Sequence, residues 1–156
     1  TKELAVQSKS LDYILKLAKA KNNLLAAIPA IQPVRNENLK RMASGFGYRT
    51  DPFTKARKMH EGMDFTAKTG TPIYASGDGT ISKVQHSGSG YGNNVMINHG
   101  YGYESLYAHM SKILVQPGQK VKKGQNSTNL AKIPRRVVVK FVPGVIKGRL
   151  VIQSNQ

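Results

Sequence analysis

A histidine and a carboxylate stand four positions apart beside a glycine, at His60 and Asp64. Imidazole nitrogen and carboxylate oxygen are ligands that suit zinc and other borderline divalent metals. An offset of four places two side chains on one face of a helix, and any even offset does so in a strand, so either element lets the pair converge on one ion. Two ligands alone do not make a metal site, and such pairs are also common as surface neighbours.

The residues around this pair favour a strand over a helix. Met63 and Phe65 alternate with His60, Gly62 and Asp64, which is the period of two that is typical of a strand. Gly62 would also destabilise the interior of a helix. We therefore expect one strand that carries His60 and Asp64 on the same face.

The second chemical candidate is His109, at the end of segment 101–110. In a strand, the odd positions Tyr103, Ser105, Tyr107 and His109 share one face, and apolar residues occupy the other. We expect the face with Tyr107 and His109 to be solvated and to suit the floor of a cleft. Taken alone, His109 is better interpreted as a hydrogen-bonded structural histidine than as a catalytic one.

Two kinds of element must position these residues. Residues 3–28 approximate the apolar stripe of an amphipathic helix. We interpret this helix as the end of a coiled coil rather than as a helix laid against the next domain. Pro29 and Pro33 then bound an extended connector. Residues 1–32 thus form the first segment. Residues 40–125 contain short apolar runs punctuated by glycine and lack crossover helices, which predicts a small, mainly antiparallel β-domain.

Composition limits the classes of function. The 156 residues suffice for one ordinary domain plus an appendage, and the absence of cysteine excludes disulfides and thiolate metal sites. The net charge is +16, and residues 105–156 hold ten of the 24 Lys and Arg residues and none of the eight acids. This excess predicts only nonspecific nucleic-acid binding, because no stripe of alternating basic and aromatic residues accompanies it. No apolar run approaches the roughly 20 residues of a membrane span, and no signal peptide is visible.

Eight short motifs between residues 45 and 125 occur in one order and spacing, and together they resemble the lysostaphin-type zinc endopeptidases, which cut peptidoglycan cross-bridges. The helix and connector are similar to the coiled coil that precedes this domain in many envelope-anchored members. The motifs are Gly45–Arg49, His60–Phe65, Gly70–Ala75, Gly79–Ile81, Gly90–Asn93, Asn98–Gly100, Tyr107–Ser111 and Val115–Gly124.

The resemblance implies a fold and a set of roles. It implies a β-sandwich or barrel-like peptidase domain, with His60 and Asp64 as the first two zinc ligands and His109 as the catalytic histidine that assists the zinc-bound water or the developing oxyanion. His99 is expected to be structural and His86 a loop residue. Peptidoglycan is then the substrate, and the bacterial cell envelope, on its periplasmic or extracellular side, is the location.

The chain departs from the family pattern after Gln125. The family continues there with a His-x-His strand whose second histidine is the third zinc ligand, whereas this chain has no histidine beyond His109. The third ligand is therefore missing, which should weaken zinc binding greatly. The basic tail at 126–156 resembles the product of a displaced reading frame. The alternative is an authentic divergent tail, whose runs at 137–139, 141–142 and 145–146 have the β propensity to complete a sheet.

Three functional hypotheses remain. The first is a zinc metalloendopeptidase that acts on peptidoglycan, with this copy impaired. The second is a non-catalytic envelope regulator that activates a cell-wall amidase, and the coiled coil could also join two copies. The third is a carrier module, because residues 118–125 resemble a turn of lipoyl and biotinyl domains. It ranks last, since the expected Met-Lys-Met attachment hairpin is absent.

Overall fold

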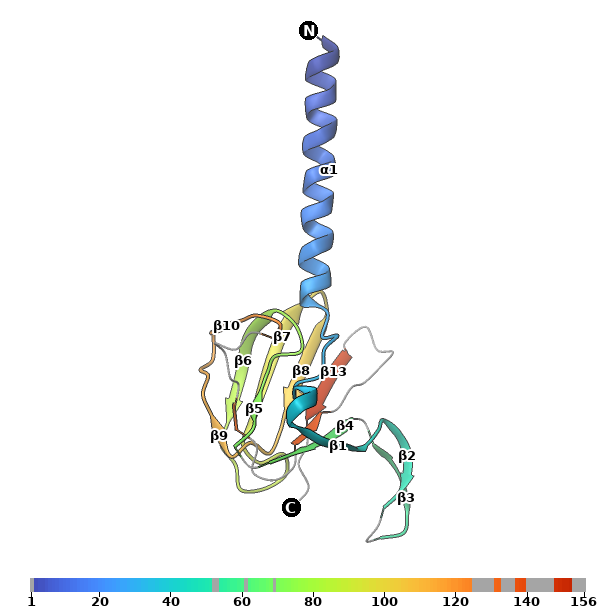
Figure 1. Ribbon diagram of the computed structural model, residues 1–156, viewed down its shortest axis with the longest axis vertical. Coiled ribbons are helices and arrows are strands. Elements are labelled where there is room, and N and C mark those ends of the chain that lie inside the picture. Colours follow the sequence, from blue (N-terminus) through green and yellow to red (C-terminus); the bar gives the residue numbers. More distant parts are fainter. Residues whose placement is uncertain are drawn as a thin grey trace.

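The computed structural model describes residues 2–51, 54–60, 62–68, 70–124, 131–132, 137–139 and 148–152. Figure 1 shows a single long helix that stands on one end of a β-domain. The N-terminus lies at the far tip of the helix. The β2–β3 hairpin lies at the opposite end of the molecule from that tip, so the helix and the hairpin project from different ends of the domain.

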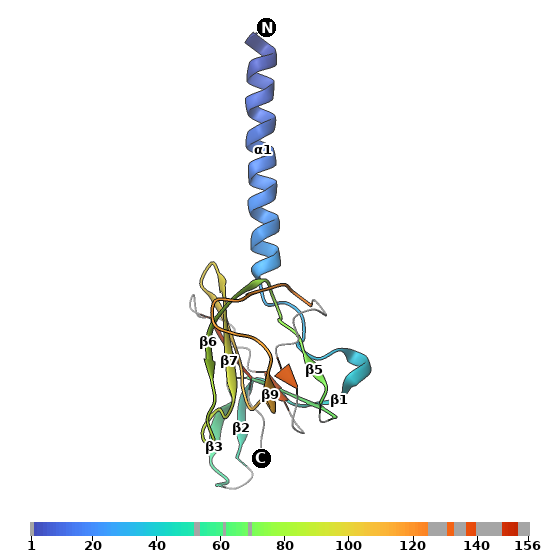
Figure 2. The ribbon, with the colours of Figure 1, turned by 90° about the vertical axis from the view of Figure 1, so that its left-hand side faces the viewer.

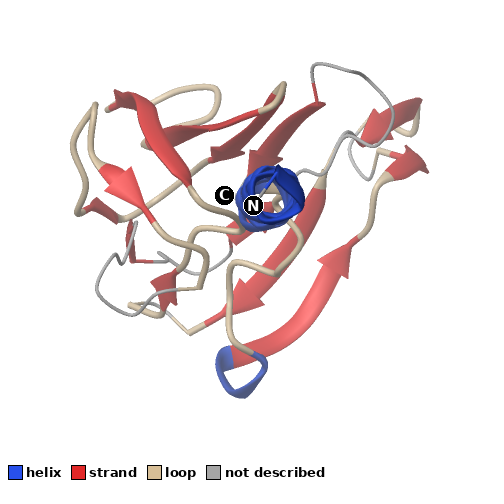
Figure 3. Ribbon diagram, turned by 90° about the horizontal axis from the view of Figure 1, so that it is seen from above, coloured by secondary structure: helices blue, strands red, loops and turns tan. Residues whose placement is uncertain are grey.

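The N-terminal helix, α1, spans Lys2–Ala27. Its length, about 39 Å at 1.5 Å per residue, carries it well clear of the domain, as the view turned by 90° also shows (Figure 2). The helix ends just before Pro29, which confirms the predicted helix and its stop. Seen from above, α1 points toward the viewer over the strands of the domain (Figure 3).

The connector after α1 packs on the domain. Val34 is fully buried in the hydrophobic core, and the Tyr74 N–H donates a 2.8 Å hydrogen bond to the Pro33 carbonyl. A short 3₁₀ helix, η1 (Asn36–Asn38), then leads into the first strand. The connector is thus part of the domain surface rather than a free linker.

The main sheet has the strand order β1-β4-β12-β8-β7-β6-β10 among the described residues, and β13 pairs with β8. All of these pairings are antiparallel except that between β13 and β8, which is parallel. The prediction of a mainly antiparallel β-domain is therefore confirmed. The bounds are β1 Leu39–Ser44, β4 Met63–Ala67, β6 Gly79–Gln85, β7 Asn94–Gly100, β8 Tyr103–Tyr107, β10 Lys120–Val121, β12 Val137–Val139 and β13 Gly148–Ile152.

Two smaller sheets complete the domain. In one, β11 (Ala131–Lys132) lies between β5 (Pro72–Ile73) and β9 (Lys112–Ile113). In the other, β2 (Gly47–Thr50) and β3 (Arg57–His60) form an antiparallel hairpin. This hairpin presents the histidine of the predicted metal pair at its last residue.

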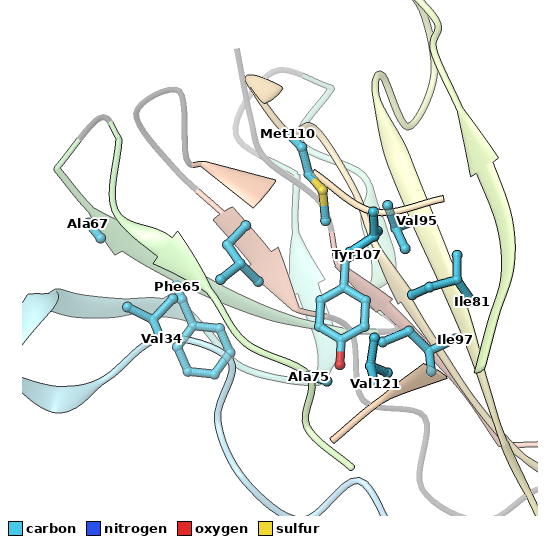
Figure 4. Close-up of a cluster of buried hydrophobic side chains, with 12 residues drawn as sticks. Val34, Phe65, Ala67, Ala75, Ile81, Val95, Ile97, Tyr107, Met110 and Val121 are labelled. Atoms are coloured by element: carbon cyan, nitrogen blue, oxygen red, sulfur yellow. The ribbon is translucent and has the colours of Figure 1, made fainter. Parts of the chain in front are cut away.

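The hydrophobic core lies between the main sheet and the segments that cover it. Figure 4 shows side chains from the connector, from β4, β6, β7 and β8 and from neighbouring loops converging there. Apolar residues that alternate along each strand supply this core, as the period of two predicts. Its buried members are Val34, Phe65, Ala67, Ile73, Ala75, Ile81, Val95, Ile97, Tyr107, Met110, Val115 and Val121.

The described parts of the basic tail are strands. β12 lies between β4 and β8, and β13 pairs with β8 along its whole length (red in Figure 1). This agrees with the expectation that the tail has the propensity to complete a sheet. The runs at 141–142 and 145–146 lie outside the described residues. Among the described helices, none has the length and apolar character needed to span a membrane.

Candidate metal centre

His60 and Asp64 meet in the structure as their spacing predicts. His60 Nε2 lies 3.0 Å from Asp64 Oδ1, and both residues are buried. Two ligands about 2.05 Å from a tetrahedral zinc ion are about 3.3 Å apart, which is close to the observed separation. The pair therefore has a separation suited to sharing one ion.

The expectation that one strand carries both residues is wrong. β3 ends at His60, and β4 begins at Met63 and belongs to a different sheet. Gly62 lies in the bend between the two strands. The chain therefore turns between the hairpin and the main sheet, and this turn, rather than the alternation of one strand, brings the two side chains together.

The hydrogen bonding of His60 leaves one ring nitrogen, Nε2, without a hydrogen-bond partner. Nδ1 donates to the Gly45 carbonyl at 2.7 Å, because a carbonyl oxygen can only accept. Nε2 then carries the lone pair, and this nitrogen has no hydrogen-bond partner although it is buried. An imidazole lone pair that faces a carboxylate oxygen 3.0 Å away is stabilised by a cation, so these two donors fit a divalent metal.

Arg49 is a charged neighbour that the sequence analysis did not assign. Its Nη1 lies 3.6 Å from Asp64 Oδ2, on the opposite carboxylate oxygen from His60. The hairpin explains the contact, because Gly47 of β2 pairs with His60 of β3 and brings Arg49 close to the pair. Both Gly45 and Arg49 belong to a motif that the sequence analysis had quoted, and this was the only signal available for them.

His109 lies beyond the end of β8, on the far side of β12 from Asp64. The strand order β4-β12-β8 separates the two strands by two spacings, about 10 Å. His109 has a positive φ of 54°, its N–H donates to the Tyr91 carbonyl at 2.8 Å, and it is half-buried. Gly92 has a positive φ of 58°, and a Cβ there would lie 3.1 Å from His109 Nδ1, so this loop position favours glycine. Burial lowers the pKa of His109 and favours the neutral ring.

The predicted solvated face with Tyr107 and His109 is wrong. Tyr107 is fully buried in the core, and its hydroxyl accepts a 2.8 Å hydrogen bond from the Ser76 N–H. Leu106 and Ser105 are equally buried, so both faces of β8 are covered. The alternation also stops at Tyr107, because the positive φ of His109 turns the chain away from strand geometry.

His99 is structural, as expected. Its Nδ1 donates to the Asp78 carbonyl at 2.7 Å, and its Nε2 accepts from the Ser105 hydroxyl at 2.7 Å. Burial lowers the pKa of His99 and outweighs the opposing effect of Asp78 and Glu104. His86 lies in an exposed loop, which also agrees with the prediction.

The part of the chain that the structure describes places no third protein donor beside the pair. Among the described residues, no group of three His, Cys, Asp or Glu side chains is placed to hold a metal. The sequence after His109 contains none of these four residue types. In the main sheet, the residue directly opposite Asp64 on the next strand is Val138. The position that pairs with Asp64 on β12 therefore holds an apolar residue.

A family comparison identifies the domain. Residues 58–132 match the model described as "Peptidase family M23". These residues belong to peptidase family M23. The match begins just before His60 and includes Asp64 and His109, so the candidate residues lie inside the M23 domain.

A curated relative shares the sequence of this M23 domain. The peptidoglycan DD-endopeptidase ShyA of Vibrio cholerae is 45% identical over 86 residues, which cover 54% of this chain and 20% of the relative. The chain thus spans about a fifth of the length of that relative.

Solved structures share the fold. A zinc-containing peptidase from Vibrio cholerae has a TM-score of 0.56 and 32% identity, over 78% of this chain and 34% of that one. A mutant catalytic domain of the prophage-encoded M23 protein EnpA from Enterococcus faecalis also has a TM-score of 0.56, with 28% identity, over 77% of this chain and 92% of that one. The mainly β domain is therefore an M23 peptidase fold.

Proposed function

We propose that this M23 domain is of the zinc-dependent peptidoglycan endopeptidase type and that this chain is catalytically impaired because it supplies two zinc ligands instead of three. The single observation that carries the proposal is the buried pair of His60 Nε2 and Asp64 Oδ1, which lie 3.0 Å apart, with no hydrogen-bond partner on the His60 nitrogen. The named activities of the relatives, a peptidoglycan DD-endopeptidase and a zinc-containing peptidase, support the substrate and the metal.

Each residue has a distinct part in this proposal. His60 and Asp64 would hold the metal, and the hydrogen bond from His60 Nδ1 to the Gly45 carbonyl fixes the ring with Nε2 toward the ion. A bound zinc ion would polarise the scissile carbonyl and lower the pKa of its water to about 7. Burial lowers the pKa of His109, so near pH 7 its neutral ring can accept a proton.

The metal content tests the proposal directly. Zinc is measured by elemental analysis and by competition with a chelator, for the parent chain, His60→Ala and the exposed control His86→Ala. We expect weak binding by the parent chain, still weaker binding by His60→Ala, and no change with His86→Ala. Equal zinc binding by the parent chain and His60→Ala would contradict the assignment of the site.

Hydrolysis is then measured on purified peptidoglycan, with the released fragments separated by mass. We expect cleavage far below that of a three-ligand domain. Tight binding of about one zinc ion per chain together with rapid cleavage would show that the missing donor is supplied elsewhere, and would overturn the proposed impairment.

A second candidate follows from the ligand count. A domain that binds zinc poorly and carries a projecting helix would suit a non-catalytic envelope regulator that activates a cell-wall amidase. Adding the chain to a purified cell-wall amidase and measuring peptide release from peptidoglycan distinguishes the two candidates. Stimulation by His60→Ala equal to that by the parent chain would favour regulation, whereas cleavage without amidase would favour the peptidase.

A further inference from the structure

The helix α1 exposes apolar side chains along most of its length. Leu11, Ile14, Leu15, Leu17 and Leu25 are all more than half exposed, although isolated leucines of this kind are usually buried when a helix packs on its own domain. Figures 1 and 2 show why: apart from its C-terminal end, α1 stands free of the described β-domain in both views. Because most helical stability in proteins comes from packing of an apolar face, a free helix of this composition requires a partner.

The spacing of these residues is that of a coiled-coil seam. Leu11, Ala18 and Leu25 recur every seven residues, and Ile14 follows Leu11 by three. A repeat of seven with apolar residues at its first and fourth positions keeps one stripe of a helix facing a second helix. The pattern is weaker at Lys21, which occupies the fourth position of the next repeat.

Two lysines of α1 lie away from the apolar stripe. Lys9 and Lys16 are also seven residues apart, and at 100° per residue they lie about 160° around the helix from Leu11 and Ala18. Both lysines are exposed. Pairing through the leucine stripe therefore leaves these lysines in water on the outer sides. An acidic partner would be attracted to the lysine side instead, so this arrangement favours a second copy.

The joint between α1 and the domain holds the helix in place. Lys123 Nζ donates to the carbonyls of Leu25 and Ile28, at 3.2 Å each, and so places a cation at the C-terminal end of the helix, where it is stabilising. The Asp78 N–H donates to the Ala26 carbonyl at 2.8 Å. A Cβ on Gly77 would lie 2.5 Å from the Ala27 carbonyl oxygen, so the two backbones are in close contact. The apolar stripe is thus presented in a fixed direction.

We propose that α1 pairs with α1 of a second copy of this chain through the stripe of Leu11, Ile14, Ala18 and Leu25. A leucine-sized side chain removes about 100 Å² of apolar surface when it is buried, so the stripes of two copies bury on the order of 1,000 Å² with their neighbours. That area reaches the lower bound of a specific protein interface, which corresponds to a dimer of modest affinity.

The oligomeric state tests this pairing. Sedimentation equilibrium of the full chain is measured from about 1 to 100 μM at about 0.15 M salt. At this salt concentration the repulsion between two positively charged chains is screened beyond about 8 Å. We expect the mass at high concentration to reach twice the 17.1 kDa of the chain. A monomer throughout this range would overturn the proposal and leave the stripe to a partner other than a second copy.

A pair of matched variants locates the contact. Leu11→Ser with Ile14→Ser removes two stripe residues, and we expect the dissociation constant to rise at least about tenfold. Lys9→Ser with Lys16→Ser changes the opposite face, and we expect less than about a twofold change. The heat unfolding of the β-domain, followed by near-ultraviolet circular dichroism, should be the same in both variants. If the stripe variant associates as strongly as the parent chain, the pairing is not through α1.

Discussion

At the scale of single residues, hydrogen-bond geometry separates the histidines into roles that sequence position alone does not. His99 has both ring nitrogens paired inside the protein, whereas His60 has one nitrogen paired and one facing Asp64 without a hydrogen-bond partner. A histidine with both nitrogens satisfied supports the fold. One with a fixed tautomer and a free lone pair suits a metal.

The first prediction concerns the acid sensitivity that His99 confers. Burial lowers its pKa in the folded state, so below the ordinary value of 6.5 the unfolded chain binds the proton more readily. The contribution of the neutral His99 ring to the free energy of unfolding is therefore complete above pH 6.5, and it is lost as the pH falls through the folded-state pKa. Urea unfolding of the parent chain and of His99→Gln at pH 7.5 and pH 5.5 measures this effect.

We expect His99→Gln to lose less stability than the parent chain between the two pH values, while its stability at pH 7.5 is lower by about 1–3 kcal/mol because buried hydrogen bonds are lost. His86→Gln, at an exposed position, is the control and should keep the parent pH dependence. His109 has a lowered pKa as well and contributes in the same direction in all three proteins. An unchanged pH dependence in His99→Gln would refute the assignment.

At the scale of elements, the site depends on how a hairpin and a sheet strand meet. β3 delivers His60 from the β2–β3 hairpin, and β4 delivers Asp64 from the main sheet. β12 is the next strand beyond Asp64, and its register places Val138 directly opposite that residue. Directly opposite residues of an antiparallel pair have Cβ atoms about 4.5–5.5 Å apart. A ligand introduced at position 138 would thus occupy the register position opposite Asp64.

The second prediction follows from that register. Val138→His places an imidazole opposite Asp64, and we expect zinc affinity to rise at least about a hundredfold as the donor count reaches three. Chelator competition with purified protein measures the change. Val138→Asn, which is similar in shape but a poor zinc ligand, is the control and should bind zinc as the parent chain does.

The gain must also depend on the existing pair. We expect His60→Ala combined with Val138→His to return the affinity to about that of the parent chain or below. If the combined variant retains the full gain, the new histidine binds zinc elsewhere, and the described register of β12 does not complete this site.

At the scale of the whole molecule, the net charge predicts nonspecific binding to polyanions. The chain carries a net charge of +16. A charge of this size attracts polyanions without reading their sequence, because phosphate contacts release counterions whatever the bases are.

The third prediction is that nucleic-acid binding is weak, nonspecific and sensitive to salt. Fluorescence anisotropy with two single-stranded DNAs of unrelated sequence measures it at 50 and 200 mM salt. We expect equal affinities for the two sequences. We also expect a fall of about fiftyfold between the two salt concentrations if about four phosphates are neutralised. A tenfold preference for one sequence would contradict this interpretation.

The sequence by itself determined which residues could bind a metal and which class of fold would hold them. His60 and Asp64 carry that information because an offset of four converges in either regular element, and the glycine-punctuated apolar runs at 40–125 specify short antiparallel strands. It also showed that no histidine follows position 109, which is the observation behind the predicted loss of the third ligand.

Only the tertiary structure decided how the site is built. The alternation of residues could not show that the chain turns at Gly62, because a bend depends on which sheet each half joins. Tyr107 was predicted to face solvent and is instead buried, since both faces of β8 are covered by segments distant in the sequence. The contact of Arg49 with Asp64 and the pairing of Val138 with Asp64 also depend on how segments distant in the sequence pair with one another. Long-range pairing sets which residues become neighbours, whereas local patterns specify only the elements.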